Sequence, residues 1–443
     1  MRAERSERGL GGPPVVETAY GRVQGVESRG IRVFKGIPYA AAPTGDRRFR
    51  APRPPQPWTG TREAKRPASA AIQASVPGLR FLNLTGGIRQ SEDCLSLNIY
   101  TPGTNSTRRP VIVWIHGGGF LIGSGTTPIY DGRGLARLGD SVVVTLNYRL
   151  GALGYLSLDA FGDDYRGACN AGIRDQIAAL EWVRENIDRF GGDPNNLTVC
   201  GQSAGAMSIA ALIGSPRARG LFHRAICQSG AADHVNTAAE AATVTEAFMG
   251  ELGIRRPEEL GSVDVRRILR AQGATNRRLV NRRKLMCFLP VIDGDLITQG
   301  PLEAIRSGAA AHIPLLVGTT LDEWKLFSMF DMPPNAMHER GLVKRFAEVL
   351  PSVAQSAPAA GQAAREYREA VRSRGGKTSP FEVWSAFQSA RVFHYPASQL
   401  ADAHVAAGGD AYSYLFTWQP RLLRRSLGAF HAIDVPFLFG VSR

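Results

Sequence analysis

A serine stands between two glycines in the pentapeptide Gly201-Gln202-Ser203-Ala204-Gly205. A short strand pattern at 197–200 precedes it, and a run of small residues typical of a helix, 206–213, follows it. Glycines at a strand-to-helix turn permit a sharp bend that holds the serine hydroxyl above the edge of a sheet. The pattern predicts that Ser203 is a nucleophile in acyl transfer. The alternative interpretation of these residues alone is an ordinary glycine-rich turn.

A second glycine-rich segment, His116-Gly117-Gly118-Gly119-Phe120, follows the strand pattern at 111–115. Consecutive glycines allow several peptide N–H groups to point at one position, where they can stabilise the charge on an attacked carbonyl oxygen. The segment matches neither G-x-G-x-x-G nor G-x-x-x-x-G-K-[ST], the patterns of nucleotide-phosphate loops. We therefore interpret it as a candidate oxyanion hole, with a flexible glycine turn as the alternative.

A serine hydroxyl needs a general base, and that base needs a carboxylate to orient it. After a serine of the G-x-S-x-G type, the acid comes first along the chain and the histidine second. His431 lies just after the late strand pattern 412–416, where a loop can return over the sheet edge. The strand pattern 314–317 leads into Asp322 and Glu323, and position alone does not choose between these two carboxylates.

Strands must position these residues, and the continuous apolar runs at 111–115 and 141–146 predict strands buried on both faces, whereas 95–100 alternates with a period of two. Over 172–189 apolar residues recur at three- and four-residue steps, which is typical of an amphipathic helix. Strands that alternate with helices imply a mostly parallel sheet. Residues 44–65 are predicted to be an irregular loop, and 233–290 and 331–398 to be helical insertions at the rim. The predicted strands are 15–26, 31–39, 95–100, 111–115, 141–146, 197–200, 225–227, 314–317 and 412–416.

The composition is that of a globular protein: of 443 residues, 44% are hydrophobic and 21% are charged. The 53 Lys and Arg exceed the 39 Asp and Glu, which gives a formal charge of +14. Because the arginines are scattered and no basic helix stands out, we interpret them as a solvated surface and do not expect nucleic-acid binding. No apolar run approaches the roughly 18 residues of a spanning helix, so we expect no membrane span.

The N-terminus has basic residues without an apolar run behind them, so no signal peptide is visible. The five cysteines contain no C-x-x-C pair and predict neither a zinc site nor a disulfide scaffold. We therefore expect a cytoplasmic protein without a metal or other cofactor. Residues 1–13 are predicted to be a disordered tail, and 14–443 a single domain that contains the two insertions.

Taken together, the motifs resemble the type-B carboxylesterases, the branch of the α/β-hydrolases that also includes the cholinesterases. Residues 190–205 are similar to the serine signature of that family throughout, and 92–98 to its second signature. NYRLG at 147–151, NAGIRDQ at 170–176 and GAFHAIDVPFLFG at 428–440 also fit. The resemblance implies an α/β-hydrolase fold and a serine hydrolase that cleaves small-molecule carboxylic esters through an acyl-enzyme intermediate.

The resemblance also implies a role for individual residues. Ser203 would be the nucleophile, His431 the base, and Glu323 rather than Asp322 the acid. Ser229, in a Gln-Ser-Gly sequence after a strand, resembles a hydroxyl that lies behind the acid; the alternative is a plain small residue. The implied oxyanion hole consists of the peptide N–H groups of Gly118, Gly119 and Ala204.

Three departures from the family pattern carry expectations of their own. No cysteine precedes Cys94, so the loop that eukaryotic members close with a disulfide is open here. Residues 72–93 contain no Trp, so choline esters are not expected to be preferred. The family usually continues past the histidine loop with a helix that covers the sheet edge, and we expect this helix to be missing. The alternative function is therefore an inactive or truncated carboxylesterase-like protein.

The substrate itself is open at this level, since an amide, lactone or carbamate would need the same machinery. The rim insertions are expected to shape the pocket. Candidate wall residues are Phe288, Phe327, Met329 and Trp418.

Overall fold

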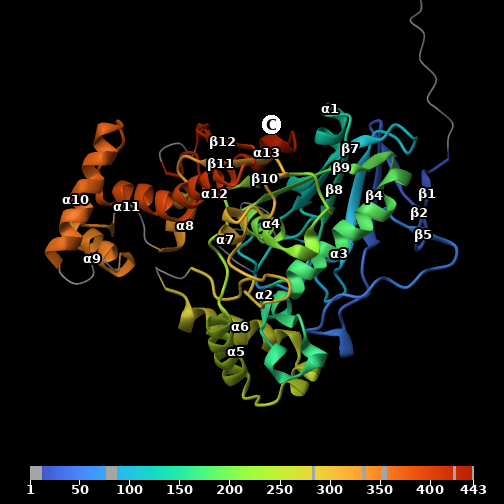
Figure 1. Cartoon of the computed structure of the whole chain (residues 1–443), viewed down its shortest axis with the longest axis horizontal. Helices are drawn as coiled ribbons and strands as arrows, with labels where there is room; N and C mark the ends of the chain where they lie inside the picture. Colours follow the sequence, from blue (N-terminus) through green and yellow to red (C-terminus); the bar gives the residue numbers. More distant parts are fainter. Residues whose placement is uncertain are drawn as a thin grey trace, which may run out of the picture.

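A nine-stranded sheet forms the centre of the protein, seen here in a computed structural model, with the strand order β12-β11-β10-β9-β7-β8-β6-β4-β3 (Figure 1). A small sheet of β1, β2 and β5 lies at the side of the N-terminus. The structure describes residues 12–75, 87–281, 285–331, 336–350, 357–422 and 426–441. Residues 1–11 of the predicted disordered tail lie outside this part of the chain, as does the side chain of Met329.

The strands agree closely with the predicted apolar runs. One difference is β5, which pairs with β2 inside the stretch 44–65 that we expected to be irregular. All three residues of β5 are polar and exposed, so this strand leaves no apolar signal in the sequence. The strands are β1 (Val15–Thr18), β2 (Gly21–Gln24), β3 (Val26–Ser28), β4 (Ile31–Pro38), β5 (Thr61–Glu63), β6 (Ser96–Thr101), β7 (Arg109–Ile115), β8 (Val142–Leu146), β9 (Gly192–Gln202), β10 (Arg224–Gln228), β11 (Leu315–Thr320) and β12 (Ala411–Phe416).

The helices of the described residues include the predicted amphipathic helix, which is α3 and ends earlier than expected, in a 3₁₀ turn from Ile187 to Phe190. The α-helices are α1 (Arg133–Leu138), α2 (Gly151–Tyr155), α3 (Ala171–Asn186), α4 (Ala204–Gly214), α5 (Ala238–Leu252), α6 (Val265–Leu279), α7 (Pro301–Arg306), α8 (Trp324–Asp331), α9 (Glu339–Val349), α10 (Ala357–Ser373), α11 (Pro380–Ser389), α12 (Tyr395–Ala406) and α13 (Val435–Leu438).

The sheet is parallel from β8 through β7, β9, β10 and β11 to β12, and antiparallel from β8 through β6 and β4 to β3. The register pairs Ile115 with Gly201 and Gln228 with both Gln202 and Gly318. The carboxyl ends of β7, β9, β10 and β11 therefore lie at the same edge of the sheet. The loops that carry the candidate residues all begin at this edge, which is where sites of open parallel sheets form.

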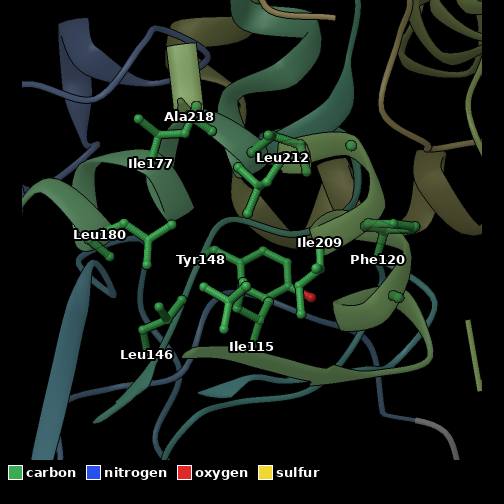
Figure 2. Packing of buried hydrophobic residues seen from close by; sticks show 14 of the residues in the cluster. Ile115, Phe120, Leu146, Tyr148, Ile177, Leu180, Ile209, Leu212 and Ala218 are labelled. Carbon is green, nitrogen blue, oxygen red and sulfur yellow. The ribbon is translucent and has the colours of Figure 1, made fainter. Parts of the chain in front are cut away.

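Helices cover the middle of the sheet, where strands such as β8 are buried on both faces, whereas the edge strands β12 and β3 are partly exposed. Residues at alternate positions of β7 enter different buried clusters: Val111, Val113 and Ile115 pack under α3 and α4, whereas Trp114 packs with α1 and α13 on the other face. Figure 2 shows the first cluster, where side chains of α3 and α4 meet those of the strand ends. The labelled members are Ile115, Phe120, Leu146, Tyr148, Ile177, Leu180, Ile209, Leu212 and Ala218.

Two of the family-like motifs serve the fold rather than the chemistry. Arg149 of NYRLG forms a bidentate ion pair with Asp175 of NAGIRDQ, with nitrogen–oxygen distances of 2.8 and 2.6 Å. Both side chains are buried, and Arg149 also donates to the carbonyl of Arg50. The pair ties the start of α2 to α3, and the removal of either partner would leave a buried charge unpaired.

The helices α5 and α6 fall within the first predicted insertion, and α9, α10 and α11 within the second (Figure 1). The second group forms its own apolar cluster around Phe346, Trp384 and Phe387. The division of the chain into one domain with two insertions remains a prediction. Among the residues that the structure describes, no helix combines the length and the apolar sequence that crossing a bilayer requires.

Candidate active site

The turn between β9 and α4 holds Ser203 in a backbone conformation that residues other than glycine rarely adopt, with φ 57° and ψ −126°. Its N–H donates to the carbonyl of Gln228 at 2.8 Å, and its carbonyl accepts from the N–H of Met207 at 2.9 Å. The turn is therefore anchored to the neighbouring strand on one side and to the helix on the other. A strained conformation that the surroundings impose in this way is typical of a functional position.

Glycines are needed around this turn because the backbone of another strand passes close to it. A Cβ atom on Gly205 would lie 2.0 Å from the carbonyl oxygen of Ile115, and one on Gly201 would lie 2.7 Å from the carbonyl carbon of Gly205. One on Gly230 would lie 2.5 Å from the carbonyl oxygen of Ser203. The two glycines of the pentapeptide are thus required for packing as well as for the bend.

The loop after β7 lies directly against the serine. A Cβ atom on Gly117 would come within 3.0 Å of the Ser203 Cβ. Gly118 and Gly119 have φ values of 117° and 62°, which turn their peptide groups away from the strand direction. The carbonyl of Gly118 accepts from the N–H groups of Leu121 and Ile122, both at 3.1 Å, and this closes the loop.

The peptide N–H groups of Gly118, Gly119 and Ala204 have a feature in common: none of them donates a hydrogen bond to any residue that the structure describes. Unpaired backbone donors are rare in folded proteins unless they serve a ligand or water. Because the loop and the start of α4 both adjoin Ser203, these three groups are available to an oxygen atom bound beside it.

His116, which begins the glycine loop, is a site residue that our reading of the sequence did not assign. It is buried, stacks on Tyr148 with ring centroids 4.4 Å apart, and its Nδ1 lies 2.8 Å from the carbonyl oxygen of Gly117. Burial lowers its pKa from 6.5 to about 4, so the ring is neutral at pH 7. The ring therefore contacts the Gly117 carbonyl and Tyr148 at the start of the loop without bringing a positive charge into the site.

His431 and Glu323 are brought together across 108 positions of sequence, with His431 Nδ1 2.5 Å from Glu323 Oε2. Glu323 is fully buried, and its Oε1 accepts from the N–H of Thr320 at 2.7 Å. The rings of Phe327 and Phe393 lie 4.9 and 4.8 Å from the imidazole centroid. The carboxylate therefore accepts from Nδ1 and leaves Nε2 as the basic nitrogen of the neutral ring.

Asp322 is the other carboxylate that sequence position allowed as the acid, but its hydrogen bonds stabilise the loop before His431 instead. Its Oδ2 accepts from the N–H of Ala429 at 2.9 Å, and its own N–H donates to the Ala429 carbonyl. Its Oδ1 lies 3.0 Å from Lys325 Nζ. A Cβ atom on Gly428 would lie 2.1 Å from Asp322 Oδ2, so the loop can approach this closely only with a glycine there.

Gln202, inside the pentapeptide, occupies the position beside the imidazole in this structure. Its Nε2 lies 2.9 Å from His431 Nε2, and its side chain is buried. Within the described part of the chain, no hydrogen bond joins Ser203 Oγ to His431, although both residues line the same cavity. Sequence reasoning did not single out Gln202, because its side chain meets His431 only after a long-range contact forms.

Ser229 adopts a positive φ of 52° and is fully buried at the end of β10. Its N–H donates to the carbonyl of Gly318, and its hydroxyl has no hydrogen-bond partner among the described residues. A role for Ser229 behind the acid thus remains a prediction.

Asp434 is a second buried carboxylate near His431, and it also escaped our reading of the sequence. Its Oδ2 accepts from Gln228 Nε2 at 3.0 Å and from the Tyr414 hydroxyl at 3.1 Å. Burial raises the pKa of this carboxyl, and the negative charge of Glu323 raises it further.

A cavity of about 370 Å³ opens beside Ser203 and His431. Of the predicted wall residues, Phe327 lines it, but Phe288 does not, because its ring packs on Phe248 in the core. Trp418 is also not a wall residue, since it is half-exposed and packs edge-to-face against Phe437. The apolar part of the wall is Leu121, Ile122, Ile129, Met207, Leu285, Met286, Trp324, Leu326, Phe327, Val392, Phe393, Ala432 and Val435.

No group of three or more His, Cys, Asp or Glu side chains is arranged to hold a metal ion within the ranges that the structure describes. The five cysteines are all buried, and none of them is in a disulfide. The chemistry that this site can perform with its own residues is that of a hydroxyl nucleophile, an imidazole held by a carboxylate, and three unpaired peptide donors.

Comparison with known proteins gives one consistent answer. The profile of the Carboxylesterase family matches residues 12–443. A para-nitrobenzyl esterase of Bacillus subtilis is 40% identical over 96% of this chain and 83% of its own length. A phenmedipham hydrolase of Pseudarthrobacter oxydans is 38% identical over 96% of this chain and 82% of its own.

Solved structures agree with the sequences. A carboxylesterase of Geobacillus stearothermophilus superposes with a TM-score of 0.82 at 40% identity, covering 96% of this chain and 83% of its own. The predicted α/β-hydrolase fold is thereby confirmed. The chain belongs to the carboxylesterase family and is a carboxylic ester hydrolase.

Proposed function

We propose that the protein hydrolyses esters through an acyl-enzyme, with Ser203 as nucleophile, His431 as general base and acid, and Glu323 as the carboxylate that orients it. The main support for the proposal is that the three groups lie close together. Ser203, the glycine loop and His431 border a single cavity, and Glu323 holds the far nitrogen of the imidazole. The alternative of an inactive relative has less support, because each of these side chains is present.

In the proposed first step, Ser203 Oγ attacks the ester carbonyl while His431 Nε2 accepts the hydroxyl proton. The N–H groups of Gly118, Gly119 and Ala204 would bind the oxyanion, and their lack of other partners supports this role. The imidazolium then returns the proton to the departing alcohol oxygen, which leaves an ester of Ser203. Water, activated by the same nitrogen, releases the acid and restores the serine.

The hydrogen bond between Gln202 and His431 Nε2 must be exchanged before attack, since that nitrogen has one lone pair. Catalytic hydrogen bonds of this kind often form only when substrate is bound. We therefore assign Gln202 a holding role in the free enzyme, in which it keeps Nε2 unprotonated.

The walls of the cavity favour an uncharged ester with alkyl or aromatic groups, because the described residues that line it include no Asp, Glu, Lys or Arg. A cytoplasmic location stays a prediction, supported by five cysteines that form no disulfide. The absence of nucleic-acid binding also stays a prediction.

The test is covalent labelling with a fluorophosphonate, read by intact-protein mass and by peptide mapping. We expect one adduct, on Ser203, in the wild-type protein, and none in Ser203→Ala, which should keep its thermal unfolding curve and lose hydrolysis of para-nitrophenyl butyrate. A folded wild-type protein that neither takes the label nor hydrolyses the ester would overturn the proposal.

A further inference from the structure

A second cavity of about 280 Å³ adjoins the active-site cavity. The two share four wall residues, which therefore mark the passage between them: His234, Leu285, Met286 and Val392. Three of these are apolar, so His234 supplies the hydrogen-bonding side chain at the junction. The second cavity adds three charged side chains, those of Asp233, Glu240 and Arg391.

A contact with Asp233 fixes the orientation of the His234 imidazole. Its Nδ1 lies 2.8 Å from Asp233 Oδ1, and its side chain is 13% exposed, against 40% for the aspartate. Since a carboxylate accepts, Nδ1 carries a proton, and in the uncharged imidazole the lone pair of Nε2 is then available to a donor. None of the residues that the structure describes makes a hydrogen bond to Nε2.

The charges around the junction favour a donor over an anion. Asp233 contacts His234, and it also attracts the guanidinium of Arg391, whose Nε donates to Gln388. Glu240 accepts from the backbone and hydroxyl of Thr237 at the start of α5. Among the described wall residues, an anionic group entering here would meet two carboxylates and one guanidinium that Asp233 already attracts, whereas an N–H or O–H group would meet an open acceptor.

We propose that His234 and the walls of the second cavity form a subsite for an uncharged N–H or O–H donor that the substrate carries at a distance from the reacting ester. The proposal rests on the proposed function, because it describes the same cavity. It deepens that function by naming the substrate class: esters with an amide or alcohol group on one arm, and not only plain alkyl or aryl esters.

The test compares two substrates of equal size. The first is the para-nitrophenyl ester of N-acetyl-γ-aminobutyric acid, and the second replaces its N–H by a methylene. A second pair carries the same two groups on the alcohol side of an acetate ester, and shorter and longer spacers vary the reach. A third ester, ending in a carboxylate, probes the preference for an anion.

We expect the wild-type protein to favour the N–H member of one pair by about 3- to 10-fold in kcat/KM, the effect of one hydrogen bond. The ratio should fall to about 1 in His234→Leu. It should be retained in part in His234→Gln, whose amide oxygen can accept at a similar reach. His312→Leu removes an exposed histidine outside both cavities and should keep the wild-type ratio.

Three outcomes would overturn the subsite: equal kcat/KM within both pairs at every spacer length, a preference that survives in His234→Leu, or a preference for the carboxylate ester. Failure of the proposed function is distinguishable, because it would abolish turnover of both members of each pair and of para-nitrophenyl butyrate. Measurable but equal rates would reject only the subsite.

Discussion

The adjacent carboxylates Asp322 and Glu323 offer a sharp test of the site, because the structure gives them different tasks. In Glu323→Gln, the N–H of Thr320 still needs an acceptor, and it has the amide oxygen of the new side chain within reach. The amide nitrogen must then face His431 Nδ1, which Glu323 Oε2 contacts at 2.5 Å in the wild type. Two donors cannot share this contact, so the imidazole must move its proton to Nε2.

An imidazole protonated at Nε2 cannot accept the proton of Ser203. We expect kcat to fall by about 10³- to 10⁴-fold, the size of effect known for a carboxylate-to-amide change behind the catalytic histidine of a serine protease, which has a different fold. This corresponds to about 4 to 5.5 kcal/mol of activation free energy. KM should change little, because Glu323 is fully buried and does not line the cavity.

The matched control is Asp322→Asn, which keeps an acceptor for Ala429 but loses the ion pair with Lys325. Lys325 retains Glu382 at 3.0 Å. We expect a loss of about 1–3 kcal/mol in unfolding free energy and a kcat within about tenfold of wild type. Steady-state kinetics with para-nitrophenyl butyrate and urea unfolding measure both quantities. If Asp322→Asn abolished turnover while Glu323→Gln stayed near the wild-type rate, the assignment of the acid would be wrong.

Three further changes test the packing and the buried charges. Gly205→Ala places a Cβ 2.0 Å from the Ile115 carbonyl oxygen and should lower the free energy of unfolding by about 3 kcal/mol or more. Its control is Gly250→Ala in α5, where the Cβ enters open space and stability should stay equal or rise. Equal melting temperatures of the two variants would contradict this expectation. The pKa of His116 is lowered to about 4, so between pH 6.5 and 4 this side chain is neutral in the folded protein but protonated in the unfolded chain. The free energy of unfolding should therefore fall by about 3 kcal/mol as the pH is lowered over this range. His116→Phe should reduce this pH dependence of the free energy of unfolding, measured by urea unfolding at each pH. If the pH dependence is unchanged, the titration of His116 is not its cause. Asp434 has a raised pKa, so the folded state holds its proton to higher pH than the unfolded chain, and unfolding free energy should decline as pH rises above the ordinary value of 3.8. Asp434→Asn should remove this decline with pH, and at pH 8 the variant should have a higher melting temperature than the wild type. A lower melting temperature would contradict the view that a buried carboxylate at position 434 destabilises the protein.

The sequence by itself determined the parts of the site that depend on local backbone geometry. A strand, a Gly-x-Ser-x-Gly turn and a helix follow one another within about twenty residues, so the conformation of Ser203 was predictable from neighbours in the chain. The same holds for the glycine loop after β7. The strands were predictable because apolar runs that are buried on both faces leave a continuous signal. The short exposed strand β5 lacked that signal, as did the polar end of β3 after Val26.

The tertiary structure decided which side chains meet across the sheet edge. Position alone left Asp322 and Glu323 equivalent, and their separate contacts with Ala429 and His431 arise from a loop more than a hundred residues away. Gln202 was likewise visible in the sequence, but its contact with the imidazole was not. Phe288 and Trp418 were wrongly expected in the cavity wall, because aromatic residues carry the same sequence signal in a core, on a surface and in a pocket. Local propensity acts over a few residues, whereas side-chain partners at a site are set by the register and crossing of strands, which only the folded chain specifies.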